Sequence, residues 1–288
     1  MLWSGAAGLM FSVLNALVRH LTLQLEPMQA QFLRYLFGLA VMLPWALRQG
    51  LRGCLPQRIG GQFLRGALHT AGLVLWFIAL PRISLADMTA IGFTGPIFVM
   101  IGAALFLREP MRWERWVATV AGFAGVLIVV APNLSGGGGG YHLVMLASAP
   151  VFAASFLLTK VLTRHESPGV IVLWQALTVT LLSLPAAWWV WQPLTPAQWL
   201  GFAVTGLLGS AGHWCLTHSF VAADISATQS MKFLELVWAA LLGWMMFAEV
   251  PGSAALLGGA IISAATVWLA RREARSSSVA DVAGDDRP

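Results

Sequence analysis

The sequence is poor in charged residues. Only 10% of its 288 residues are Asp, Glu, Lys or Arg, whereas an ordinary soluble domain contains about 25%. So few charges cannot cover a water-facing surface of this size, which excludes a soluble enzyme, a nucleic-acid-binding domain and a disordered protein. Cysteine is also scarce. The two cysteines, Cys54 and Cys215, lie far apart, which argues against both a disulfide framework and a cysteine metal site.

Apolar residues take the place of the missing charges. They make up 58% of the chain, and the mean hydropathy is +0.76. A membrane-spanning helix needs roughly 20 residues, and we place ten such spans, separated by prolines, at about 2–20, 28–47, 63–81, 85–107, 114–131, 142–162, 169–191, 197–220, 226–248 and 252–270. The sequence therefore predicts an all-α integral membrane protein with ten transmembrane helices. No basic segment precedes residues 2–18, which favours a first span over a signal peptide.

The basic residues are distributed unevenly between the two expected membrane sides. Thirteen of the 17 Lys and Arg residues fall on one side, within 48–65, 108–115, 160–164 and 271–287. Arg19 and Arg82 would lie on the other side. Since Lys and Arg accumulate in cytoplasmic loops, we expect both termini in the cytoplasm, including a polar tail at 272–288.

The chain also contains a weak internal repeat. Five consecutive glycines within residues 135–140 separate a first half, 1–134, from a second half, 141–271. An offset near 140 aligns Gly66 with Gly206 and Glu109 with Glu249. Because each half has five spans, an odd number, the second half enters the membrane from the opposite side. We expect two inverted five-helix repeats around a central cavity, an arrangement typical of alternating-access carriers.

Two sequence segments resemble a known family. The runs FLRYLFGLA at 32–40 and TGPIFVMIGAALFLREPMRWERWVATVAGFAGVLIVV at 94–130 are similar to the EamA domain of the drug/metabolite transporter superfamily. The likeness covers both halves, although the second has Gln175 where the first has Arg34. It implies a ten-helix metabolite exporter of a bacterial inner membrane. Length and a Trp-rich interior resemble more narrowly the YddG-type amino-acid exporters.

Polar side chains inside the spans are the candidate substrate-binding groups, because ionisable residues in a membrane are costly and usually face a cavity. Lys232 and Glu235 share one helix face. They either form an internal ion pair or bind a substrate carboxylate and ammonium. His69 and His213 occupy nearby positions on repeat-related helices and either pack or bind substrate. The expected binding residues, including two deep tryptophans, are His69, Trp76, His213, Trp214, Lys232 and Glu235.

Arg34 is a weaker candidate. Its side chain either snorkels outward or pairs with backbone carbonyls, or it takes part in binding or gating. Asn15 and Gln175 are expected to line the cavity. We expect no metal site, since His213, Cys215 and His218 do not share a helix face, and we expect no cofactor.

The expected function is secondary transport: export of small metabolites, above all aromatic or other neutral amino acids. The alternatives are a carrier for another metabolite or a drug-like cation, an intramembrane enzyme, and a non-transporting membrane sensor.

Ser210 and His213 lie one turn apart on one helix, a poor arrangement for a nucleophile and its base, so we expect no enzyme. The sequence has no G-x-x-x-x-G-K-[ST] motif, which excludes ATP-driven transport by this chain alone. The expected partners are a small-molecule substrate and membrane lipids, with no nucleic acid, and the chain is expected to be a monomer or a weak homodimer.

Overall fold

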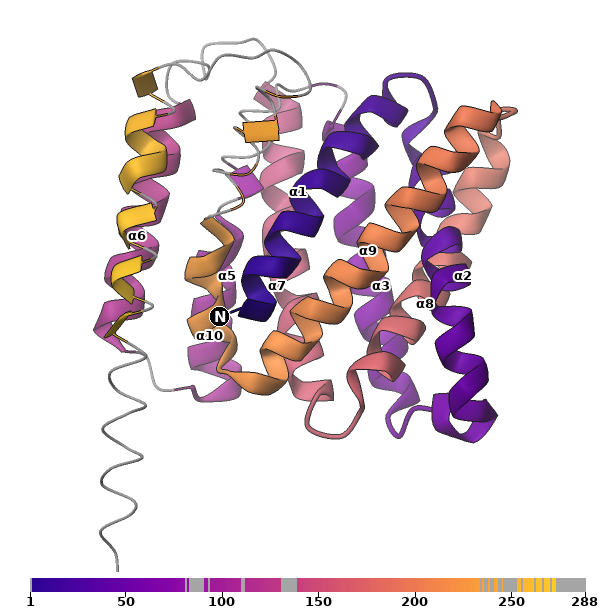
Figure 1. Cartoon of the computed structure of the whole chain (residues 1–288), viewed down its shortest axis with the longest axis horizontal. Coiled ribbons are helices and arrows are strands. Elements are labelled where there is room, and N and C mark those ends of the chain that lie inside the picture. The colour runs from indigo at the N-terminus through magenta and orange to yellow at the C-terminus, as the bar shows by residue number, and fades with distance from the viewer. Residues whose placement is uncertain are drawn as a thin grey trace, which may run out of the picture.

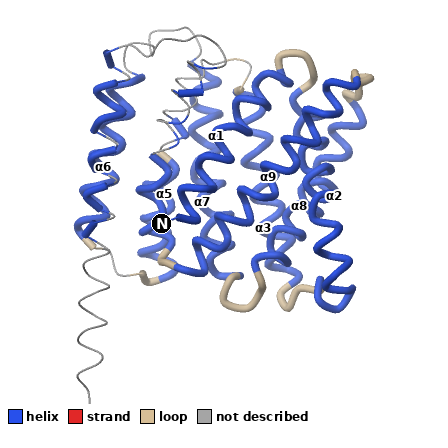
Figure 2. Tube along the Cα trace, in the orientation of Figure 1, coloured by secondary structure: helices blue, strands red, loops and turns tan. Residues whose placement is uncertain are grey.

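The structure is a computed structural model. It describes residues 2–80, 82, 91, 92, 94–109, 112–130 and 139–233, together with scattered positions between 235 and 272. This part of the chain is helical and contains no strand (Figures 1 and 2). The elements are α1 (Leu2–Thr22), α2 (Pro27–Cys54), α3 (Ile59–Ala79), α5 (Gly95–Gly102), the π-helix η1 (Ala103–Leu107), α6 (Trp113–Val130), α7 (Gly139–Leu162), α8 (Pro168–Trp189), α9 (Pro196–Ala222), α10 (Ile225–Gln229) and the 3₁₀ helix η3 (Ser230–Phe233).

Several helices are long and apolar enough to cross a membrane. Among the described residues these are Leu2–Thr22, Pro27–Gly50, Gly140–Leu162 and Pro168–Trp189. Large apolar side chains point outward from the bundle, and Trp188 and Trp189 at the end of α8 are 77% and 88% exposed. A surface of this kind suits lipid, with the tryptophans at the interface. The predicted all-α membrane architecture is confirmed at this level.

Prolines lie at helix starts, as the sequence predicted, and a capping box precedes one of them. Pro27, Pro168 and Pro196 each occupy the first turn of their helix, where proline has no backbone hydrogen bond to lose. Before α9, Thr195 and Gln198 form a reciprocal capping box.

Two predicted boundaries were wrong in α2 and α3. The polar turn after residue 47 still belongs to α2, which passes through a non-helical Gly50 (φ +71°) and continues to Cys54. Helix α3 begins at Ile59, four residues earlier than expected. Arg65, which was counted among the basic residues of the expected cytoplasmic side, lies inside α3 and is 2% exposed, so it does not face water. Hydropathy could not place these two helix ends, because the last turns of α2 and the first turn of α3 contain polar residues although they are helical.

Other predicted segments lie outside the described residues. These are most of the glycine linker, the start of the span at 85–107, parts of the spans at 226–248 and 252–270, and the tail after residue 272. Within the described part, α7 begins at Gly139, so the last two residues of the predicted linker are helical.

The connections between helices gather at two ends of the bundle (Figure 1). At one end the α1–α2 and α8–α9 connections meet, where the Gln29 side chain bonds the backbone of Gln192 at 2.7 and 2.8 Å. At the other end the α2–α3 and α7–α8 connections meet, where Arg58 N–H donates to Glu166 at 2.9 Å. Helices α1, α2 and α3 therefore run opposite to α7, α8 and α9, respectively (Figure 1).

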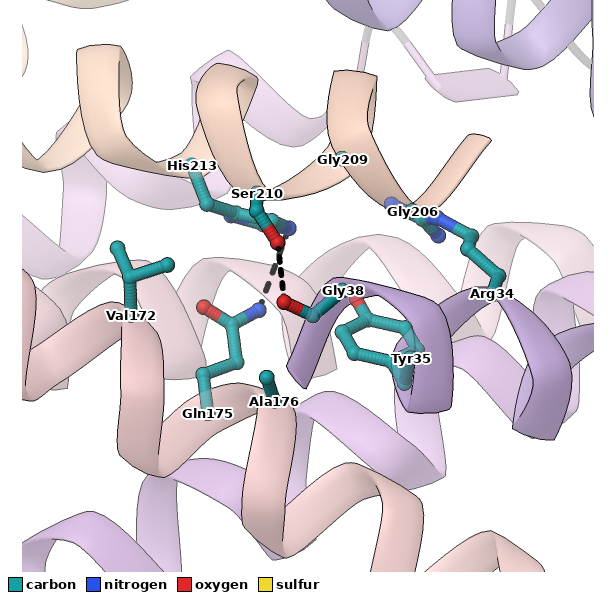
Figure 3. A pocket seen from close by; sticks show the side chains of 10 residues that line it. All are labelled: Arg34, Tyr35, Gly38, Val172, Gln175, Ala176, Gly206, Gly209, Ser210 and His213. Carbon is teal, nitrogen blue, oxygen red and sulfur yellow. Dashed lines mark hydrogen bonds between the residues drawn. The ribbon is translucent and has the colours of Figure 1, made fainter. Parts of the chain in front are cut away.

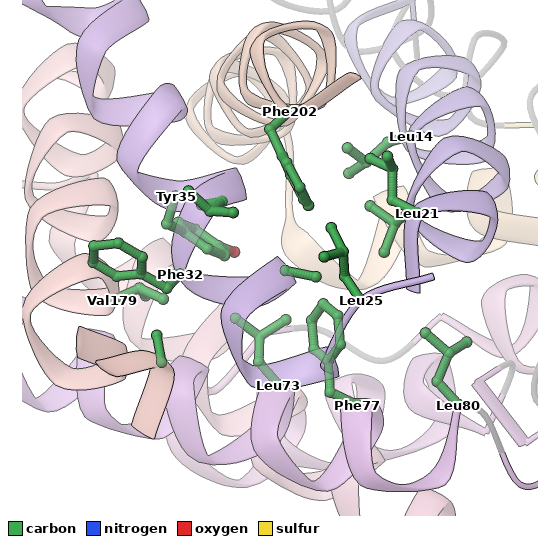
Figure 4. Close-up of a cluster of buried hydrophobic side chains, with 14 of the residues drawn as sticks. Leu14, Leu21, Leu25, Phe32, Tyr35, Leu73, Phe77, Leu80, Val179 and Phe202 are labelled. Carbon is green, nitrogen blue, oxygen red and sulfur yellow. The ribbon is translucent and has the colours of Figure 1, made fainter. Parts of the chain in front are cut away.

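The two halves pack against each other with matching contacts. Helix α3 packs on α7 and α1 on α9, while α2 packs on both α8 and α9, and α3 on α8. A Cβ added at Gly72 would lie 2.9 Å from the Phe152 ring, and one at Gly212 would lie 2.8 Å from the Phe11 ring. These close approaches place α3 against α7 and α9 against α1. Beside them, Leu14, Leu73, Phe77 and Phe202 belong to the main apolar core (Figure 4).

Candidate functional site

A cavity of about 190 Å³ lies between the two halves. Its wall is formed by residues of α1, α2, α3, α5, α7, α9 and η3, and by positions just outside these helices. Most of the predicted site residues line it, namely Asn15, Arg34, His69, Trp76, His213, Lys232 and Glu235. The rest of the wall is largely apolar and includes Phe11, Phe152 and Phe156. Apolar walls with a few convergent polar groups are typical of small-molecule sites.

Two predicted residues lie elsewhere. Trp214 packs edge-on against Trp45, with ring centroids 5.8 Å apart, and beside His218 at 5.5 Å, so it is not among the cavity-lining residues. Gln175 lines a second, smaller space of about 10 Å³, between α2, α8 and α9 (Figure 3). That volume suits about one water molecule. Arg34 and His213 line both spaces.

The two histidines meet in the wall between the spaces. The ring centroids of His69 on α3 and His213 on α9 are 5.3 Å apart. Phe152 stacks edge-on against His69 at 5.3 Å, and Phe11 does so against His213 at 5.0 Å. The close approaches at Gly72 and Gly212 bring these phenylalanines to the rings. Both imidazoles line one cavity, and their role in binding substrate stays a prediction.

Arg65 is the buried site residue that the sequence reasoning missed. Its guanidinium donates to Thr159 Oγ1 at 2.5 Å, to Ile171 O at 3.0 Å, and to Gln175 Oε1. No carboxylate is among these acceptors. Its spacing of four residues before His69, on the same helix face, was the available signal.

The Arg65 contact fixes the state of His213. Arginine has only donors, so Gln175 must turn its oxygen to Arg65 and its amide nitrogen to His213. That nitrogen lies 3.3 Å from His213 Nε2, which must accept. His213 is therefore neutral and carries its proton on Nδ1. His69 is held differently, by Tyr35 Oη at 2.8 Å from its Nε2.

Arg34 lies in the cavity wall and not at the outer surface. It is 9% exposed, and its guanidinium carbon lies 4.8 Å from the centroid of the Tyr35 ring. Its Nε is buried and has no hydrogen-bond partner among the described residues. The outward-snorkelling alternative does not agree with this placement.

Lys232 and Glu235 face the cavity separately. Lys232 Nζ lies 4.5 Å from the centroid of the Phe156 ring, a cation–π contact. Within the described residues, the ion pairs within 4.0 Å are Arg112–Glu114 and Arg115–Asp224. The internal Lys232–Glu235 ion pair is therefore not formed in this structure, and both charges remain accessible to a ligand.

Hydrogen bonds at one end of the bundle hold the segment that carries Lys232. Lys160 Nζ donates to Phe220 O at 2.6 Å and to Ala223 O at 2.7 Å. Glu109 accepts from the backbone N–H groups of Ile225 and Ser226 at 3.0 and 3.1 Å. Glu109 thus has a structural role, and these contacts position η3 beside the cavity. Among the described residues, no group of three or more His, Cys, Asp or Glu side chains is arranged to hold a metal ion.

Comparison with known families agrees with this architecture. The EamA-like transporter family matches residues 1–131 and 140–271, which is nearly the whole chain in two copies. The chain belongs to the EamA-like transporter family.

Named relatives are similar along most of their length. A riboflavin transporter from Rhizobium johnstonii is 34% identical, covering 95% of this chain and 91% of the relative. An S-adenosylmethionine uptake transporter from Rickettsia prowazekii is 28% identical, with coverage of 93% and 90%. A pseudopaline exporter from Pseudomonas aeruginosa is 29% identical, with coverage of 92% and 93%. Family and relatives identify a membrane transporter of small metabolites, not an enzyme.

A solved structure shares the fold. A crystal structure superposes with a TM-score of 0.80 at 19% identity and covers 96% of this chain and 97% of the other. At that identity the likeness concerns the fold alone.

Proposed function

We propose that this protein is a secondary transporter that exports amino acids, aromatic or other neutral ones, through alternating access of two inverted five-helix repeats. In this proposal ten helices cross a bacterial inner membrane, residues 1–134 and 141–271 form the repeats, and residues 135–140 link them. The observation that carries the proposal is the position of the cavity. It lies where His69 and His213, on repeat-related helices, contact each other.

Matching contacts support the inverted repeat. The approach of Gly72 to Phe152 has a counterpart in the approach of Gly212 to Phe11, at offsets of 140 and 141 residues. Corresponding helices also run in opposite directions (Figure 1). Two such halves can exchange conformations and open one cavity to either side in turn.

The ends of the bundle support the orientation. Arg58 and Arg164 lie in the connections at one end, together with Arg112 before α6, whereas Arg19 lies near the other end. The positive-inside rule then places the arginine-rich end in the cytoplasm.

Single cysteines at Gln24 and at His165, in a background lacking Cys54 and Cys215, test this orientation in intact cells with an impermeant thiol reagent. We expect labelling at Gln24 only, and labelling at His165 only would reverse the orientation.

Free charges in the cavity support an amino-acid substrate. Lys232 would bind the carboxylate and Glu235 the ammonium group, since neither is ion-paired with a described residue. The aromatic wall of Phe11, Phe152 and Phe156 would hold an apolar side chain. The pseudopaline exporter among the relatives supports export as the direction.

Flux through purified protein in liposomes tests the proposal. We expect uptake of phenylalanine or tryptophan to be at least tenfold above that of empty liposomes. Lys232→Ala and Glu235→Ala should each abolish it. The double variant should fold but stay inactive, because no group remains to bind the two charged ends. Near-normal amino-acid flux in the double variant would contradict the assigned roles, and transport of riboflavin or S-adenosylmethionine without any amino acid would contradict the substrate class.

A further inference from the structure

The cavity contains more positive than negative charge. Its ionisable lining residues among those described are Arg34, Lys232, Glu235 and the two histidines. His213 is neutral because its Nε2 accepts from the Gln175 amide. Two cations thus face one carboxylate, and Arg65 behind them adds another cation with only neutral acceptors. A charge away from water is costly unless an opposite charge compensates it. An additional anion in the cavity would therefore be stabilised by these cations.

Arg34 lines both the cavity and the smaller space beside it. Helices α2 and α9 approach so closely that a Cβ at Gly206 would lie 2.7 Å from Gly38 N. One turn further along α9, Gly209 faces the guanidinium of Arg34, and a Cβ there would lie 3.4 Å from its Nε. Gly209 belongs to the wall of the smaller space, where the buried Arg34 Nε has no partner among the described residues. The Arg34 side chain also lines the cavity, where a ligand can reach it.

We propose that Arg34 binds a second anionic group of the substrate, so that the preferred substrates carry one net negative charge. This inference rests on the proposed transport function and changes its preferred substrates from neutral to acidic amino acids. The ammonium of an amino acid lies at Glu235, its α-carboxylate at Lys232, and a second carboxylate at Arg34. A planar guanidinium suits a carboxylate because it offers two parallel donors. The class is therefore an amino acid with an acidic side chain, including one attached to an aromatic ring.

The test uses pairs of nearly equal size that differ by one negative charge. The probes are L-glutamate with L-glutamine, and L-4-carboxyphenylalanine with its side-chain amide, and the measurement is competed flux in liposomes. For any pair that the wild type transports, we expect the acid to be preferred about tenfold or more, the scale of one hydrogen bond between charged groups.

Arg34→Gln should abolish that preference, measured as the ratio of acid flux to amide flux. The matched control is Arg48→Gln, on the same helix but exposed, which should keep the preference. Arg34→Lys preserves the charge without the paired donors and should restore part of the preference, which identifies a loss caused by charge and not by misfolding.

Three outcomes would overturn the inference. One is equal transport of acid and amide by the wild type. Another is an unchanged preference in Arg34→Gln. The third is a wild type that transports phenylalanine, tryptophan or riboflavin but neither pair, which would leave the transport function standing. If no compound is transported at all, the proposed function fails, and this inference fails with it.

Discussion

The two halves of the protein agree in their packing and differ in their charges. The glycine–phenylalanine approaches on either side of the histidine pair match at offsets of 140 and 141. The charged positions do not match. Lys232 and Glu235 correspond at an offset of 140 to Gly92 and Gly95, which also line the cavity. Arg34 corresponds to Gln175, and Arg65 to Thr205, at offsets of 141 and 140.

This difference separates two tasks. Equivalent backbone contacts allow either half to adopt the conformation of the other, which alternating access requires. Because the charged lining residues of the two halves differ, the cavity can bind an unsymmetrical molecule in one orientation. Each charged group of the substrate then has a single residue of opposite charge to bind. Packing and charge can therefore be disturbed independently.

The largest effect is expected from disturbing the packing where backbones touch. In Gly206→Ala the new Cβ would lie 2.7 Å from Gly38 N and from Phe37 C. No side chain can move aside, so α2 and α9 must separate, and we expect a loss of about 3 kcal/mol, the upper range for overpacking. Thermal unfolding in detergent, followed by tryptophan fluorescence, measures this change.

The matched position in the first half provides the control. A Cβ at Gly66 meets the side chain of Thr178 and no backbone atom within the same reach. Gly66→Ala should therefore also destabilise, but Thr178→Gly should rescue it in the double variant. If Thr178→Gly fails to rescue, the side-chain contact is not what requires glycine at residue 66.

Sequence patterns predicted the packing better than the charges. Prolines placed the starts of α2, α8 and α9, and the repeat placed His69 near His213. Arg65 was counted among the basic residues of the cytoplasmic side, because it lies near the start of its predicted span, although it is buried in the second turn of α3. Its acceptors on α7 and α8 lie 94 to 110 residues away in sequence. Contacts at that separation, like the turn of Trp214 toward Trp45, require the tertiary fold.

A smaller effect is expected from changing Gln175, which hydrogen-bonds both Arg65 and His213. Gln175→Leu removes the acceptor of a buried guanidinium and the donor to His213, which should cost about 1–3 kcal/mol. Gln175→Glu keeps an acceptor and compensates Arg65, so stability should equal or exceed that of the wild type. His213 Nε2 would then lose its donor, and substrate flux should fall. Thermal unfolding and liposome flux on both variants separate these effects, and equal destabilisation by Leu and Glu would show that Arg65 does not need this acceptor.

The smallest effect is expected at the corresponding hydrogen bond of the first half. Tyr35 donates to or accepts from His69 Nε2 at 2.8 Å, whereas its counterpart at an offset of 141 is Ala176. Tyr35→Phe removes one neutral hydrogen bond and keeps the ring beneath Arg34, so it should cost about 0.5–1.5 kcal/mol. That loss should be smaller than the loss in Gln175→Leu, which breaks one neutral and one charged hydrogen bond. Unfolding curves recorded side by side decide the order. A loss in Tyr35→Phe equal to that in Gln175→Leu would mean that the charge on Arg65 adds nothing to its bond, and that the two walls of the cavity are energetically alike.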